Sequence, residues 1–218
     1  FSNEDIDIFF ATISEQIAEC KRFHAKAFQS FRRDKAMFAT IYTGNLRACE
    51  AVRLSINSFQ EEPFIKELKK FAYMNVWGKG SGGSGARFRE VPVTDIEYPE
   101  VMEWYCQCVR PWYLEQADPN ETALFLSERG KRISYPALRK RFNEIVTLAG
   151  LDGKNYTLHS FRRAGAFHDT CNMDMQSVQH KMGHHFYATL CGYLPSNDPY
   201  MREEHYNAIK RQLKKRRR

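Results

Sequence analysis

The sequence predicts a mainly α-helical fold with a small β-hairpin or sheet. In several long segments, apolar residues recur at the three- and four-residue spacing of amphipathic helices. One stretch, residues 73–93, instead has two short alternating runs on either side of a glycine-rich loop, which is typical of a hairpin. With 218 residues, 43% of them hydrophobic, the chain can bury a real core as one large domain or two small ones.

Helices are expected throughout the N-terminal quarter. The first spans residues 2–22, because Ser2 is a suitable N-cap and two acidic residues follow in the first turn. A second covers about 25–42 and ends at a Thr-Gly-Asn break. A third is expected over about 46–58, and a short helix over 62–71 leads into the hairpin.

The hairpin consists of a strand over 73–77, a loop over 78–85 and a return strand over 88–93. The loop lacks the order of a P-loop, since no Gly-Lys-Ser/Thr opens a helix after it, so nucleotide binding is excluded.

Helical periodicity returns in the C-terminal half. The short apolar run 123–126 is expected to be a strand or an extended segment, and Ser134 is the N-cap of the helix that follows it. The helices expected here are 97–116, 134–148, one opened by His159, 174–182 ending at Gly183, and 200–214.

The net charge of +7 comes from the C-terminal tail. The last nine residues hold seven of the 33 basic residues, so the rest of the chain has as many basic as acidic residues. DNA binding must therefore rest on local basic clusters. The tail is either a solubilising terminus or a DNA contact.

The six cysteines show neither C-x-x-C spacing nor a Cys/His metal pattern, which predicts reduced thiols in an intracellular protein. No carboxylate cluster suits two divalent metals, so we expect no metal and no cofactor. No run of eighteen apolar residues exists, so no transmembrane helix is predicted.

The chemical signals gather near the C-terminal end. His159 and Arg162 are three residues apart, so in a helix they share a face and could present a donor and a cation to one anion. Gly183 and His184 end an apolar-periodic run, and Tyr193 follows nine residues later. Tyrosine is a competent nucleophile toward an electrophilic target. The pattern indicates phosphate chemistry with a tyrosine nucleophile.

Several basic residues have two interpretations. Arg47 and Glu50 are a surface ion pair worth less than about 1 kcal/mol, or Arg47 projects from a helix N-terminus into an anion pocket. Lys79 taken alone is a solvated loop lysine, and Arg89 is a strand-surface charge unless it faces DNA.

Arg139, Lys140 and Arg141 are consecutive, so they cannot share one helix face and at least one points elsewhere. The others suit a DNA groove, although solvated charges are the default.

The motifs together resemble the catalytic domain of tyrosine recombinases, the phage-type integrases. The resemblance covers nearly all of residues 1–195 and rests on five boxes in the right order and spacing, which are specific together although each is weak alone. The boxes are Tyr42-Thr-Gly-Asn-Leu-Arg47-Ala-Cys-Glu50, Trp77-Gly-Lys79-Gly with Arg89-Glu-Val-Pro-Val93, His159-Ser-Phe-Arg162, Gly183-His184, and Tyr193.

The resemblance implies a site-specific recombinase, integrase or transposase that cuts and rejoins DNA through a 3′-phosphotyrosine and a Holliday junction. Tyr193 would attack the scissile phosphate, and Lys79 would protonate the leaving 5′ oxygen. Arg47 and Arg162 would bind the phosphate oxygens, which guanidinium groups contact in fork geometry.

The resemblance also assigns the histidines. His159 would act as an acid or base, and His184 would donate to a non-bridging oxygen. Further DNA contacts are expected from Arg89, Arg139 and Lys140.

The partners implied are double-stranded DNA and further copies of the chain, expected as a tetrameric synapse in which residues 200–214 pack on a neighbouring subunit. Residues 1–198 are expected to be the catalytic domain and 199–218 a C-terminal helix with a basic tail. An upstream DNA-binding domain is expected to precede them. The expected location is the cytoplasm, at the nucleoid when DNA is bound, for a prokaryotic or phage protein, and the nucleus for a eukaryotic one.

Two other functions stay open. A topoisomerase of type IB or a hairpin-forming resolvase uses a related constellation, and a relaxation assay on supercoiled plasmid separates these from a recombinase. A catalytically silent DNA-binding module would bind DNA without forming a covalent adduct.

Overall fold

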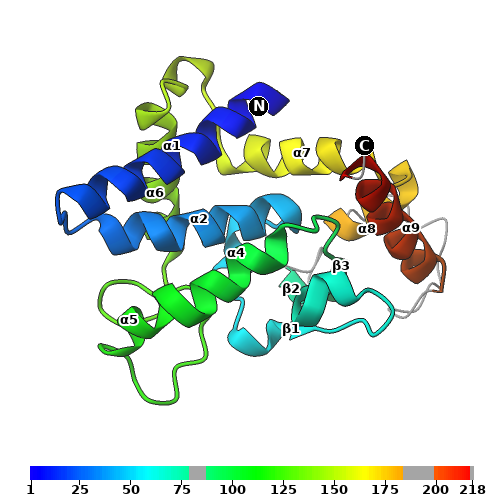
Figure 1. Cartoon of the computed structure of the whole chain (residues 1–218), viewed down its shortest axis with the longest axis horizontal. Helices are drawn as coiled ribbons and strands as arrows, with labels where there is room; N and C mark the ends of the chain where they lie inside the picture. Colours follow the sequence, from blue (N-terminus) through cyan, green and yellow to red (C-terminus); the bar gives the residue numbers. More distant parts are fainter. Residues whose placement is uncertain (79–86, 184–198, 217–218) are drawn as a thin grey trace.

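The computed structural model describes residues 1–78, 87–183 and 199–216 (Figure 1). This part of the chain is mainly α-helical, with one small antiparallel sheet of three strands in the order β1-β2-β3. The mainly α fold with a small sheet that the sequence predicts is confirmed. None of the helices in the described ranges is both long and apolar enough to cross a bilayer.

The two N-terminal helices match their predicted positions and lie side by side (Figure 1). Helix α1 spans Asn3–Arg22, and α2 spans Phe28–Thr43. Ser2 caps α1 reciprocally, since its hydroxyl accepts from the Asp5 amide and the Asp5 carboxylate accepts from the Ser2 amide, both at 3.1 Å.

The helix expected over 46–58 is wrong beyond the single turn Ala48–Ala51. Its backbone pairs instead with the extended segment 122–124: the Ile56 amide donates to the Thr122 carbonyl at 2.9 Å, and the Leu124 amide donates to the Leu54 carbonyl at 3.0 Å. This long-range pairing replaces the helical hydrogen bonds. The region consists of α3 (Ala48–Ala51), the 3₁₀ turn η1 (Ile56–Ser58) and strand β1 (Phe59–Gln60).

The predicted hairpin is present, and β1 adds a third strand that the sequence analysis does not predict. Strand β2 (Tyr73–Gly78) pairs antiparallel with β3 (Arg87–Pro92), and Val76 lies opposite Arg89 in the register. The face that holds Val76 is turned toward the core, whereas Trp77 on the other face is 56% exposed.

The short helix expected over 62–71 is wrong, because only 3₁₀ turns form there, over Lys66–Phe71, and Lys69 inside them has a non-helical backbone with φ of 50°. The other helices follow the sequence pattern closely. The helix expected over 97–116 is continuous but contains a π-helical turn, and Ser134 caps its predicted helix by accepting from the Ala137 amide at 3.3 Å. The elements are η2 (Lys66–Phe71), α4 (Tyr98–Trp104), η3 (Tyr105–Val109), α5 (Arg110–Leu114), α6 (Tyr135–Leu148), η4 (Asp152–Lys154), α7 (Leu158–Asp169), α8 (Met175–Met182) and α9 (Pro199–Arg216).

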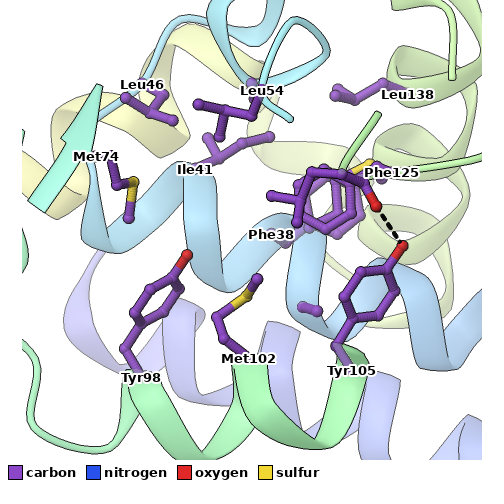
Figure 2. Packing of buried hydrophobic residues seen from close by; sticks show 14 of the residues in the cluster. Phe38, Ile41, Leu46, Leu54, Met74, Tyr98, Met102, Tyr105, Phe125 and Leu138 are labelled. Atoms are coloured by element: carbon purple, nitrogen blue, oxygen red, sulfur yellow. Dashed lines mark hydrogen bonds between the residues drawn. The ribbon is translucent and has the colours of Figure 1, made fainter. Parts of the chain in front are cut away.

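Helix α2 runs through the middle of the molecule, and its buried side chains Phe38 and Ile41 form the centre of the core (Figure 2). Phe161 of α7 packs into the same core, with ring centroids 4.9 Å from Phe9 and 5.7 Å from Phe142. Because Phe161 is fixed in this way, the next residue of α7, Arg162, has a defined position between Glu50 and the end of α8.

Helix α9 packs against its own chain. His205 is fully buried, its Nε2 donates to the Val93 carbonyl at 2.6 Å, and its ring lies edge-on to Tyr73 at 4.8 Å. Ala208 and Ile209 are buried on the same side. The buried side of α9, which holds His205, Ala208 and Ile209, therefore covers the end of the sheet.

Candidate active site

Three arginines from three elements meet at one buried carboxylate. The Glu50 side chain, which is 1% exposed, accepts from Arg47 Nη1 at 2.9 Å. It accepts two parallel bonds from Arg89, at 2.9 and 2.8 Å, which is the strong bidentate geometry. Arg162 Nη1 lies farther away, at 3.5 Å from Oε2. We call these four residues the arginine cluster.

The start of α3 explains how Glu50 reaches this position. Arg47 is the N-cap residue of α3, and its amide donates to Glu50 Oε2 at 2.8 Å, so Glu50 caps the helix from its third position. The cap turns the carboxylate inward toward β3 and α7. The interpretation of Arg47 and Glu50 as a surface ion pair is thus wrong, because Glu50 is buried and shared by three cations.

Two arginines of the cluster also bind the end of α8. Arg89 Nε donates to the Lys181 carbonyl at 3.1 Å, and Arg162 Nη2 donates to the Met182 carbonyl at 2.5 Å. The last carbonyls of a helix have no partner within the helix, so these bonds satisfy them. They hold Gly183, the C-cap residue with a left-handed φ of 65°, directly against Arg89.

The cluster carries a surplus of positive charge. Burial opposes ionisation of Glu50, but hydrogen bonds and attraction from Arg89, with bonds from Arg47, outweigh it and lower the pKa to about 2. Glu50 is therefore an anion, and it offsets one of three cations. Burial first, and then repulsion from Arg47, lowers the pKa of Arg162 to about 10. The site thus favours binding of an anion.

The three arginines of the cluster differ in how much of each side chain is exposed to solvent. The Arg162 side chain is 2% exposed and the Arg89 side chain 11%, whereas that of Arg47 is 40% exposed. His159 is exposed in the first turn of α7, three residues before Arg162 and on the same face of the helix. Arg47 and His159 are therefore exposed to solvent, whereas Arg89, Arg162 and Glu50 are mostly buried.

Three predicted catalytic residues, Lys79, His184 and Tyr193, lie outside the described residues, so their roles stay predictions. The described residues just before two of them lie at the cluster. A Cβ atom on Gly78 would be 3.0 Å from Glu50 Oε1, and one on Gly183 would be 3.1 Å from the Arg89 side chain.

The predicted DNA contacts lie in two places. Arg139 and Lys140 are exposed on α6, while Arg141 turns inward, donating from Nε to Asp34 at 2.5 Å. This confirms that one of the three basic residues points elsewhere. Arg89 is not an ordinary strand-surface charge, because it is mostly buried and bound to Glu50. The DNA contacts of Arg89, Arg139 and Lys140 stay predictions.

Glu50 and Arg89 are the site residues whose position the sequence does not reveal. The signal for Glu50 is its spacing: a Glu three residues after an N-cap residue is a capping pattern. Nothing in the local pattern of β3 distinguishes Arg89 from Arg87. Within the ranges that the structure describes, no group of three or more His, Cys, Asp or Glu side chains is arranged to hold a metal ion.

Comparison with known sequences agrees with the motifs. The model of the phage integrase family matches residues 14–199. The chain is 32% identical over 155 residues to tyrosine recombinase XerC of Pelotomaculum thermopropionicum, covering 70% of this chain and 46% of that protein. It is 28% identical over 184 residues to XerC of Haemophilus influenzae strain PittEE, covering 84% and 56%. The chain thus spans about half the length of the curated relatives it matches.

Comparison with solved structures shows the fold. The XerA recombinase crystal structure aligns with a TM-score of 0.63 at 21% identity, over 93% of this chain and 62% of the other. The XerH recombinase, in a post-cleavage complex with palindromic difH substrate, gives 0.62 at 19% identity over 99% and 51%. The catalytic core of lambda integrase gives 0.54 at 13% identity over 84% and 90%. The fold is that of tyrosine recombinase catalytic domains.

Proposed function

Since this chain belongs to the phage integrase family, we propose that it cuts and rejoins DNA as a tyrosine recombinase. In this proposal the reaction is site-specific recombination, integration or transposition through a 3′-phosphotyrosine intermediate. The single observation that carries it is the arginine cluster, in which three guanidinium groups surround one carboxylate.

The charge of the cluster fits a phosphodiester. Three cations and one carboxylate leave two positive charges in excess, and a phosphodiester brings one negative charge that grows on the non-bridging oxygens in the transition state. Preorganised cations that face those oxygens lower the barrier. Arg47 is the most exposed of the three and is proposed to bind one oxygen, with Arg162 bound to the other. Glu50 is proposed to hold both at the correct angle.

The proposed reaction exchanges one phosphodiester bond for another. The Tyr193 oxygen attacks phosphorus and forms the phosphotyrosine bond while the bond from phosphorus to the 5′ oxygen breaks. Lys79 gives its proton to that leaving oxygen. His159 takes the proton of the tyrosine, and His184 donates a hydrogen bond to a non-bridging oxygen. Because a phosphodiester is kept in the intermediate, a second 5′-hydroxyl can reverse the step without ATP.

The proposed partners are duplex DNA and further copies of the chain. Two rounds of exchange between paired duplexes pass through a Holliday junction, which requires an assembly on DNA, proposed as a tetramer. Residues 1–198 are proposed as the catalytic domain and 199–218 as a C-terminal helix with a basic tail. Helix α9 packs on the surface beside Tyr73 and Val93. In the proposed assembly this surface binds α9 of a neighbouring copy instead, as in domain swapping.

The direct test is covalent trapping. The protein is incubated, with chelator present, with a pool of nicked duplexes of randomised sequence, and DNA that stays bound after denaturation is sequenced to define the site. We expect an adduct that Tyr193→Phe abolishes. Tyr206→Phe is the matched control, since Tyr206 is an exposed tyrosine of α9.

The outcomes separate the functions. An adduct at one defined sequence that depends on Tyr193 supports a recombinase. Relaxation of supercoiled plasmid at many unrelated sequences would favour a topoisomerase. Binding of duplexes from the pool without any adduct overturns the proposal and favours a DNA-binding module.

A further inference from the structure

A second polar cluster lies buried beneath the arginine cluster. Its members are Asn45, Thr94, Asp169 and Lys181, and none is more than 5% exposed. Lysine is the residue least expected here, because its ammonium group is costly to remove from water unless it is paired. Lys181 is fully buried, so the fold has placed a charge where a typical core would hold an apolar side chain. We call these four residues the lysine cluster.

Every member is bound to another. Lys181 Nζ is 2.7 Å from Asp169 Oδ2 and donates to the Thr94 hydroxyl at 3.1 Å. The Thr94 hydroxyl donates to Asp169 Oδ1 at 2.7 Å, and Asn45 Nδ2 donates to Asp169 Oδ2 at 2.5 Å. Both oxygens of the carboxylate are therefore satisfied, and the ion pair has the hydrogen bonds that a buried pair requires.

The four residues come from the four segments that carry the proposed active site. Asn45 lies two residues before Arg47, in the turn after α2, where its left-handed φ of 48° reverses the chain. Thr94 follows β3, the strand of Arg89. Asp169 is the last residue of α7, the helix of Arg162.

Lys181 completes the connection, because its own backbone belongs to the arginine cluster. Its side chain enters the lysine cluster, while its carbonyl accepts from Arg89 Nε at 3.1 Å. The following carbonyl, that of Met182, accepts from Arg162. One residue of α8 thus links the two clusters, two residues before Gly183 ends the helix.

We propose that the lysine cluster positions the catalytic groups: the Lys181–Asp169 pair, with Thr94 and Asn45, fixes α8 and the turn before Arg47 relative to the two buried arginines. The proposal rests on the proposed function, because it names what sets the geometry of that site. These are positioning residues, since none of their side chains faces the phosphate-binding side of the arginine cluster. A displacement of about 1 Å in such a site lowers rates by about a hundredfold. The rate should therefore depend on the positions that the lysine cluster sets for α8 and for the turn before Arg47.

The first test uses one hydroxyl. Thr94→Val keeps the shape of the side chain and removes its hydrogen bonds to Lys181 and Asp169, while Thr94→Ser restores the hydroxyl. On the nicked duplex selected by covalent trapping, we expect Thr94→Val to lower the single-turnover rate of adduct formation about tenfold with DNA affinity unchanged. Thr94→Ser is expected to recover the rate.

The second test removes the charges together. Lys181→Met with Asp169→Asn replaces the ion pair by neutral groups of similar size, and Asn can still accept from Asn45. Neutral replacement of a buried pair often leaves stability nearly unchanged. We expect a melting temperature close to that of the wild type together with a slow adduct rate. A purely structural pair would leave the rate of the folded protein unchanged.

The matched control is another buried ion pair, Arg33–Asp34 of α2, with side chains 2% and 0% exposed. Arg33 lies ten residues before the end of α2, about 15 Å along the helix. Arg33→Met should lower the melting temperature but not the adduct rate of the folded protein.

The outcomes for this inference and for the proposed function are distinct. A wild-type protein that forms no adduct overturns the function and this inference with it. A wild-type adduct that Thr94→Val forms at the wild-type rate overturns the inference alone. The inference is also overturned if Thr94→Val lowers DNA affinity as much as it lowers the rate, because that result indicates general loss of structure.

Discussion

Arg162 Nη2 donates to the Met182 carbonyl at 2.5 Å, so the buried arginine of α7 holds the end of α8 as well as facing Glu50. This bond joins two residues that are 20 positions apart in the chain. Arg162 of the His-x-x-Arg motif and the end of α8 are therefore one structural unit. A substitution that removes the bond should change the position of both.

Replacing Glu50 by Gln should damage both the fold and the reaction. The three guanidinium groups would lose their shared anion and repel one another, which should lower the free energy of unfolding by about 3 kcal/mol, as expected for a broken buried pair. We expect the adduct rate to fall by about a hundredfold. Thermal unfolding and covalent trapping measure the two effects. Glu144→Gln on the surface of α6 is the control, and an equal loss there would contradict the role of Glu50.

Arg162→Lys should reduce the reaction while preserving the charge. Lysine has one nitrogen and cannot bind Met182, Glu50 and a phosphate oxygen in the planar fork of a guanidinium. A loss of about a hundredfold in adduct rate is expected, with DNA affinity within about threefold. The matched control is Arg163→Lys, at the exposed neighbouring position of α7. Wild-type rates from Arg162→Lys would show that only charge matters at this position.

Gly183→Ala tests the end of α8, and Gly150→Ala is its control. Both glycines have a left-handed φ, 65° and 68°, so alanine should cost each about 1 kcal/mol of stability. Only at Gly183 would the new Cβ contact Arg89, at 3.1 Å, whereas nothing lies within 4 Å of the Cβ position at Gly150. We expect both variants to lose stability and only Gly183→Ala to lose adduct rate. Equal rates in the two would indicate that Arg89 adapts without consequence.

Docking of α9 should weaken in acid. Burial, opposed by the bond to Val93 and assisted by Lys181, lowers the pKa of His205 to about 4 from its ordinary value of 6.5. Undocked His205 takes up a proton below about pH 6.5 and docked His205 does not. The docked state should therefore lose up to about 3 kcal/mol as pH falls from 6.5 to 4, with no change above 6.5.

Hydrogen exchange of the α9 amides across this pH range, corrected for intrinsic rates, measures the effect. In His205→Gln, which can still donate to Val93, this part of the pH dependence should disappear. If the slope persists in that variant, another group is responsible.

Exchange of α9 between subunits can be tested with a cysteine pair. Tyr73 and His205 are in ring contact, with centroids 4.8 Å apart, so Tyr73→Cys with His205→Cys places one thiol on each side of the contact between α9 and the sheet. A short bis-maleimide cross-linker spans the gap that the two removed rings leave. Cross-linking without DNA should give an intramolecular link, while cross-linking on the selected DNA should give covalent dimers. The single-cysteine variants control for the native thiols. Intramolecular links alone under both conditions would rule out the exchange.

The order of the helices and the hairpin follows from the sequence, because apolar periodicity and capping residues are local signals. Ser2 and Ser134 cap the helices they precede for this reason. The segment 46–58 differs because its backbone finds partners at 122–124, far away in the chain, which no local pattern reveals.

The sequence alone also identifies the motifs that carry Arg47, His159 and Arg162, because the residue spacing within each motif is visible without the structure. Only the tertiary structure decided that Glu50 would be shared by three arginines and that Lys181 would be buried against Asp169. Charged side chains read as solvated in a sequence because water is their default partner. They can be buried only beside oppositely charged side chains from other elements, and tertiary packing alone brings these partners together.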